Sequence, residues 1–122
     1  MRIVTVTVSD TRTADDDESG RVMAEELGRG GLSVLRHAIV RDEHADLQAL
    51  VRGVVDRGEA DAIVLSGGTG IAPRDRTIEA LRAIFDKELD GFGEAFRRLS
   101  WDEIGPRAIL SRATAGVVGA CV

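Results

Sequence analysis

The sequence predicts an α/β domain built on a mostly parallel sheet, and two observations lead to this fold class. First, apolar, β-branched runs at residues 3–8, 32–40 and 61–65 alternate with stretches in which apolar residues recur at helical spacing. Strands that alternate with helices in this order usually pair in parallel through right-handed crossovers. Second, each run is followed by polar residues that include a carboxylate. Ligand sites of open α/β sheets form at this position, outside the carboxyl ends of the strands.

The first half of the chain supplies two of the expected strands and two helices. Residues 3–8 alternate Val or Ile with Thr and lead through an acidic run into a helix expected at residues 20–29. We interpret the acidic run, residues 15–18, as favourable charge at a helix N-terminus rather than as a metal site. Residues 32–40 form the second strand. Residues 45–57 give the clearest helical pattern, with one apolar face and a glycine at the exit.

The third strand, residues 61–65, ends at a glycine-rich stretch that we call the glycine loop, residues 66–77. A helix over residues 77–85 is expected to follow it, with Thr77 at its start. After a polar break, Phe92, Phe96 and Leu99 recur at i, i+4 and i+7, which predicts a helix that packs these side chains in the core.

Residues 117–122 read as the beginning of a last buried strand. Chain termini usually lie at the surface, so an apolar strand is an unusual place for a domain to end. We therefore expect the sequence to be truncated at its C-terminus.

Composition limits the function classes. At 122 residues and 13.0 kDa the chain is expected to form one domain, and no run approaches the ~20 apolar residues of a membrane span. The net charge of −5, the absence of a basic tract and the presence of only three Phe and one Trp argue against a nucleic-acid partner. No signal peptide is recognisable, so the protein is expected to be cytoplasmic.

The glycine loop, Ser-Gly-Gly-Thr-Gly-Ile-Ala-Pro-Arg-Asp-Arg-Thr, carries the strongest functional signal. A glycine turn at a strand end lets backbone N–H groups converge on an anion, and a phosphate is the natural guest. The loop lacks the Gly-Lys-Ser/Thr ending of a P-loop, and Pro73 stands where a dinucleotide fingerprint needs glycine. The alternative is a plain tight turn whose Asp and Thr cap the next helix.

Asp75 refines this prediction, because a carboxylate beside a phosphate repels it unless a cation lies between them, and Mg²⁺ is the usual cation. Asp10 and Asp42 follow the first two strands in the same way. Because the carboxyl ends of parallel strands share one edge of the sheet, we expect all three carboxylates at that edge. The sequence thus predicts a metal-bridged phosphate site.

The ordered motifs along nearly the whole chain resemble the MoaB/MogA family of molybdenum cofactor biosynthesis proteins, which is similar to the molybdopterin-binding domain of gephyrin. These motifs are Ser9-Asp10-Thr11-Arg12-Thr13, Asp17 to Gly20, Arg41-Asp42-Glu43, Ser66 to Gly70, Arg74-Asp75-Arg76-Thr77, Gly91-Phe92-Gly93-Glu94 and Leu110-Ser111-Arg112. The resemblance implies a three-layer α/β/α sandwich. It also implies a molybdopterin adenylyltransferase that uses Mg²⁺ and ATP and assembles as a homotrimer or homohexamer.

The resemblance assigns roles to residues that match the family's motifs. Asp42 and Asp75 match its two catalytic, Mg²⁺-linked carboxylates. The positions expected to bind nucleotide or molybdopterin are Ser9, Asp10, Ser66, Gly67, Gly68, Thr69, Gly70, Thr77, Glu94 and Ser111. Two departures stand out: Arg76 replaces the family's usual Val, and Val122 precedes a Pro-Gly motif and helix that contribute to the family's pterin pocket.

Three other functions fit parts of this pattern. A carrier would hold molybdopterin without chemistry and release no pyrophosphate from ATP. A domain of the kind found in competence-damage-inducible proteins and nucleotide pyrophosphatases would hydrolyse pyrophosphate bonds without pterin. A plain α/β domain would leave three carboxylates at successive strand ends unexplained.

Overall fold

Three parallel strands form the centre of the computed structural model, which describes residues 1–122. They are β1 (Arg2–Val8), β2 (Ser33–Val40) and β3 (Ala62–Ser66), in the spatial order β2-β1-β3. β1 pairs in parallel with both neighbours. The predicted α/β class and the predicted parallel pairing are therefore confirmed.

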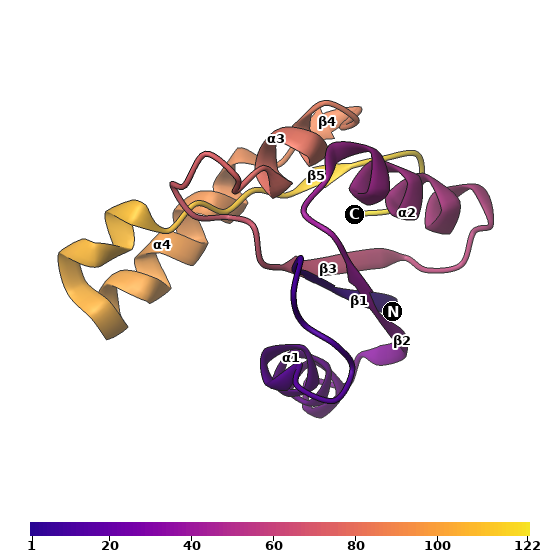
Figure 1. The fold of residues 1–122 in the computed structure, drawn as a ribbon, viewed down its shortest axis with the longest axis horizontal. Helices are drawn as coiled ribbons and strands as arrows, with labels where there is room; N and C mark the ends of the chain where they lie inside the picture. The colour runs from indigo at the N-terminus through magenta and orange to yellow at the C-terminus, as the bar shows by residue number, and fades with distance from the viewer.

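Helices cover both faces of this sheet, which gives the expected three layers (Figure 1). α1 (Glu18–Arg29) lies on one face, while α2 (His44–Asp56) and α3 (Thr77–Arg82) lie on the other. None of the helices is both long and apolar enough to cross a membrane. The acidic run acts as predicted, because Asp17 caps α1 by accepting a hydrogen bond from the Gly20 N–H at 3.0 Å.

The alternating pattern of β1 explains the two faces. Val4, Val6 and Val8 are buried against α2 and α3, where the main apolar cluster also includes Leu47 and Val54. The cluster includes Val8, so it holds in place the carboxyl end of β1, where the candidate site begins.

The opposite face of β1 is polar. Thr5 and Thr7 are buried toward β2, where their hydroxyls lie 2.8 and 3.3 Å from the ring nitrogens of His37. The same ring lies 2.8 Å from the Asp17 carboxylate, so this network joins α1 to the sheet.

The predicted helix over residues 77–85 ends early, at Arg82. The chain leaves the helix because Asp86 donates its N–H to the Val117 carbonyl and the next two residues form a strand. This strand, β4 (Lys87–Glu88), was expected only as a polar break. It pairs antiparallel with β5 (Gly116–Val117).

The prediction of a buried strand at residues 117–122 was wrong. β5 ends at Val117, and the chain turns at Gly119, whose φ of +60° suits a residue without Cβ. Val122 then lies beside β3, donating its N–H to the Asp61 carbonyl and accepting from the Ile63 N–H.

The expectation that Phe92, Phe96 and Leu99 pack in the core was also wrong. They lie on α4 (Asp90–Ile104) and are 48%, 43% and 68% exposed. α4 packs against η1 (Gly105–Leu110), and the two project from one end of the sheet (Figure 1). Apolar spacing identified the helix correctly, but spacing carries no information on what covers the stripe.

Candidate functional site

The strand register brings the ends of all three parallel strands to one edge. Thr7 lies opposite Ile39 of β2 and opposite Ser66 of β3. The polar segments that follow the strands therefore begin side by side.

Asp10 ties two of these segments together, as the sequence predicted for a carboxylate at this edge. One of its oxygens accepts a hydrogen bond from the Asp42 N–H at 3.1 Å, and the other forms an ion pair with Arg74 of the glycine loop. Asp10 is thus already neutralised by a cationic side chain. Among the three predicted carboxylates, this leaves Asp42 and Asp75 as the better candidates for a metal.

Asp42 is partly buried at this edge. Burial raises its pKa above the ordinary value, and the nearby charges of Asp75 and Glu43 raise it further. The Arg76 N–H and the Thr77 hydroxyl lie close to it and act in the opposite direction. The charge of Asp75 thus acts on Asp42, although the two residues come from different segments.

Glycine is required where the loop passes these groups. Gly68 has a φ of +62°, and a Cβ atom there would lie 2.2 Å from Thr77 Oγ1 and 2.4 Å from Asp42 Oδ2. A Cβ atom on Gly67 would lie 2.2 Å from the Val8 carbonyl oxygen of β1. The backbone of the loop thus presses directly against the strand end and the buried polar groups.

Asp75 closes the far part of the loop. Its Oδ2 accepts the Ala72 N–H at 3.0 Å, and its own N–H donates to the Ala72 carbonyl at 2.9 Å. The same Oδ2 would lie 2.5 Å from a Cβ atom on Gly70. These contacts fix the direction of the Asp75 side chain.

Two buried oxygens at the centre of the site have no hydrogen-bond partner. They are Asp42 Oδ1 and Thr77 Oγ1. Buried polar atoms are normally satisfied, and a carboxylate and a hydroxyl with free lone pairs fit a hard cation. No group of three or more Asp, Glu, His or Cys side chains could hold a metal. Mg²⁺ commonly uses only one or two carboxylates and completes its shell with water and phosphate oxygens, so the chemistry of these two oxygens is compatible with it.

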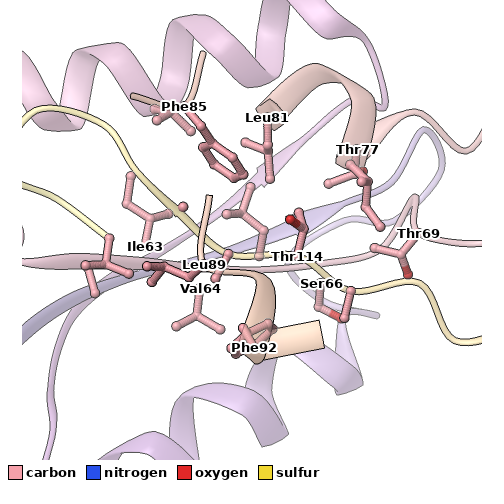
Figure 2. Close-up of a pocket in the computed structure, with 18 of the residues that line it drawn as sticks. Ile63, Val64, Ser66, Thr69, Thr77, Leu81, Phe85, Leu89, Phe92 and Thr114 are labelled. Carbon is pink, nitrogen blue, oxygen red and sulfur yellow. The ribbon is translucent and has the colours of Figure 1, made fainter. Parts of the chain in front are cut away.

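A large apolar hollow of about 570 Å³ opens on one side of the loop. Figure 2 shows Ser66, Thr69 and Thr77 at one end of it, while Ile63 and Leu89 lie toward the other. A second, more polar hollow of about 360 Å³ is lined by residues 70–73 and by Asp75, Arg76, Glu79, His44 and Arg112. Residues of the glycine loop therefore line both an apolar hollow and a charged one.

Six predicted site residues line neither hollow: Ser9, Asp10, Asp42, Gly68, Glu94 and Ser111. Asp10, Asp42 and Gly68 lie at the strand ends described above. The other three have different surroundings. The Ser9 hydroxyl accepts the N–H groups of Thr11 and Arg12, which stabilises the turn after β1. Glu94 is exposed on α4, and Ser111 lines neither hollow.

Arg112 belongs to one of the quoted motifs but was given no role in the sequence analysis. Arg112, next to Ser111, reaches the glycine loop and lines both hollows. Its spacing from the loop, 43 residues to Thr69, hides this contact from any local pattern.

Comparisons with known proteins give matches over nearly the whole chain. Residues 4–121 match the family described as probable molybdopterin binding domain. The chain is 51% identical over 118 residues to molybdenum cofactor biosynthesis protein B of Halalkalibacterium halodurans, covering 96% of this chain and 69% of the relative. It is 41% identical over 124 residues to a probable molybdopterin adenylyltransferase of Methanocaldococcus jannaschii, covering 96% and 73%.

A solved structure is also similar. The fold matches a crystal structure of a molybdenum cofactor biosynthesis protein B with a TM-score of 0.91 and 44% identity, over 97% of this chain and 74% of that one.

Proposed function

Because the chain belongs to the family of probable molybdopterin binding domains, we propose that it acts in molybdenum cofactor biosynthesis by transferring the adenylyl group of ATP to molybdopterin. The observation that carries this proposal is the pair of unpartnered oxygens, Asp42 Oδ1 and Thr77 Oγ1, beside the close-packed backbone of Gly68. These two oxygens would be available to a divalent cation, which would supply positive charge beside a bound phosphate.

In the proposed step a terminal phosphate oxygen of molybdopterin attacks the α-phosphorus of ATP. A new P–O bond forms while the bond from the α-phosphorus to the bridging oxygen breaks, and pyrophosphate leaves with that electron pair. A phosphate monoester is already anionic near neutral pH, so no strong general base is needed. Positioning and charge neutralisation can therefore supply most of the rate acceleration.

Different residues at this edge of the sheet would bind the metal, the phosphate and the pterin. Asp42 and Asp75 would hold Mg²⁺, with the Thr77 hydroxyl beside them. When bound, Mg²⁺ would neutralise charge on the reacting phosphates. The backbone N–H groups from Gly67 to Gly70 would hold a phosphate in line. The apolar hollow beside Ser66 and Thr69 offers a surface for the pterin.

The test measures pyrophosphate release by the purified chain with ATP, Mg²⁺ and molybdopterin. Asp75→Asn is expected to abolish metal-dependent release while molybdopterin binding, followed by fluorescence, partly persists. Asp56→Asn is the matched control, because Asp56 is exposed on α2 away from the site. Unchanged turnover of Asp75→Asn would refute the role of this carboxylate.

Two outcomes would favour the alternative functions. Molybdopterin binding without any pyrophosphate release would identify a carrier. Hydrolysis of ATP in the absence of pterin would favour a pyrophosphatase. A homotrimer or homohexamer remains a separate prediction, which the mass in solution would test.

A further inference from the structure

One arginine joins four separate parts of the candidate site. Arg112 lies in the segment between η1 and β5, and its Nε donates to the Thr69 carbonyl at 3.1 Å. Its Nη2 donates to the Asp75 carbonyl at 3.3 Å. The two Nη atoms also bind the Glu79 carboxylate of α3 at 2.5 and 3.2 Å. The guanidinium therefore spans both arms of the glycine loop.

We propose that Arg112 is the positioning residue that holds the glycine loop in its working shape, with Glu79 locking the guanidinium in place. The proposal deepens the proposed function and rests on it for the chemistry. Thr69 and Asp75 flank the turn of the loop, so fixing their carbonyls fixes the distance between its two arms. The Asp75 carbonyl belongs to the residue whose carboxylate lies near Asp42.

The donor geometry separates this role from direct phosphate binding. A guanidinium has five N–H groups in a rigid fork, and the contacts to Thr69, Asp75 and Glu79 use four of them. About a third of the side chain remains exposed. Four of the five N–H groups of Arg112 are thus used in hydrogen bonds within the protein, and the Glu79 carboxylate balances its charge.

Substitution by lysine distinguishes the directional hydrogen bonds of the Arg112 guanidinium from its positive charge. Arg112→Lys keeps the positive charge but cannot bridge two carbonyls and a carboxylate from fixed directions. If Arg112 acted as a simple charge for an anion, this variant would retain most of the function. If Arg112 positions the loop, the variant fails almost as severely as Arg112→Gln.

The first measurement is amide hydrogen exchange in the chain without ligands, so it does not depend on catalysis. The amides of Ala72, Asp75 and Thr77 are hydrogen-bonded within the loop. We expect Arg112→Lys to speed their exchange by about tenfold or more, because the loop opens locally. Arg82→Lys is the matched control. Arg82 lies on α3, as Glu79 does, but its guanidinium pairs with Glu88 of β4 and does not contact the glycine loop.

The second measurement is steady-state pyrophosphate release. Small misplacements of reacting groups cost ~100-fold in rate, so kcat of Arg112→Lys should fall by about 10- to 100-fold while KM for ATP stays within about twofold. Glu79→Gln should give a smaller fall in kcat in the same direction, because the guanidinium keeps its two carbonyl contacts. Arg82→Lys should match the unsubstituted chain.

The outcomes are separable. Unchanged exchange in Arg112→Lys, equal acceleration in Arg82→Lys, or a loosened loop with unchanged kcat would each overturn the positioning role. A chain without pyrophosphate release would contradict the proposed function, and the exchange comparison would still decide whether Arg112 holds the loop.

Discussion

The close approach of Gly68 to Thr77 Oγ1 and Asp42 Oδ2 gives the sharpest test of the site. Gly68→Ala adds one methyl group to a backbone with a φ of +62°, and this conformation costs a residue with Cβ ~1–2 kcal/mol. Alanine also lowers the conformational entropy of the unfolded chain, which offsets ~0.4–1 kcal/mol of that cost. The backbone alone should therefore cost about 1 kcal/mol.

The contacts add a second cost. The new methyl would lie 2.2 Å from Thr77 Oγ1 and 2.4 Å from Asp42 Oδ2, and Thr77 is buried while Asp42 is partly buried. Overpacking of this kind costs ~1–3 kcal/mol, which brings the total to about 2–4 kcal/mol. For a chain of this length the melting temperature should fall by roughly 4 °C per kcal/mol, or about 8–16 °C. Mg²⁺-dependent pyrophosphate release should fall ~100-fold, because Asp42 and Thr77 must move.

Gly58→Ala provides the control. Gly58 has a φ of +57°, and nothing lies within 4 Å of a Cβ atom placed there. This variant therefore has the same backbone cost without the clash, and its activity should be unchanged. Urea unfolding, thermal unfolding and turnover would be compared for the two variants. Equal stability losses, or full activity in Gly68→Ala, would refute the reasoning about this contact.

Local pattern was sufficient for the sheet, because β-branched runs and a two-residue period are properties of neighbouring residues. The alternation of Val4, Val6 and Val8 with Thr5 and Thr7 already separates an apolar face from a polar one. Parallel pairing then followed from the order of strands and helices, and it placed Asp10, Asp42 and the glycine loop at one edge.

Local sequence pattern could not predict which parts of the chain pack over each helix or strand. Phe92 and Phe96 have the spacing of a buried stripe, yet they lie on a helix that projects from the sheet. The end of α3 likewise depends on a distant segment, because the Asp86 N–H donates a hydrogen bond to the Val117 carbonyl. Both errors concern contacts between residues that are far apart in the sequence.

The same limit applies within the site. Glycine spacing identified the loop, whereas the partners of the loop were chosen by the fold. Arg74 neutralises Asp10, and Arg112 binds the Thr69 and Asp75 carbonyls from 43 and 37 residues away. A sequence shows which groups can bind an anion or a metal, and only the fold shows which of them are already engaged by one another.

The remaining predictions concern single polar groups. Thr77→Val removes a buried hydroxyl that lies beside the Asp42 carboxylate without a hydrogen bond to any other group, so stability should change by about 1 kcal/mol or less while Mg²⁺-dependent activity falls; a large loss of stability in urea would contradict this. Burial raises the pKa of Asp17, but hydrogen bonds from Thr7, His37 and the Gly20 N–H lower it to about 2, so Asp17→Asn should destabilise the chain at pH 7. That loss should vanish as the pH falls from about 4 to about 2, and a loss that persists at pH 2 would be evidence against the charge. Asp42 behaves in the opposite way, because its pKa lies above the ordinary value of 3.8. The stability it contributes is full below that value and is lost as the pH rises through the folded pKa, so ionised Asp42 destabilises the metal-free chain at pH 7. Asp42→Asn should therefore unfold at higher urea concentration than the unsubstituted chain at pH 7, with the difference shrinking below about pH 4. Mg²⁺ should raise the melting temperature of the unsubstituted chain and leave that of Asp42→Asn unchanged, because the variant lacks the charge that binds it.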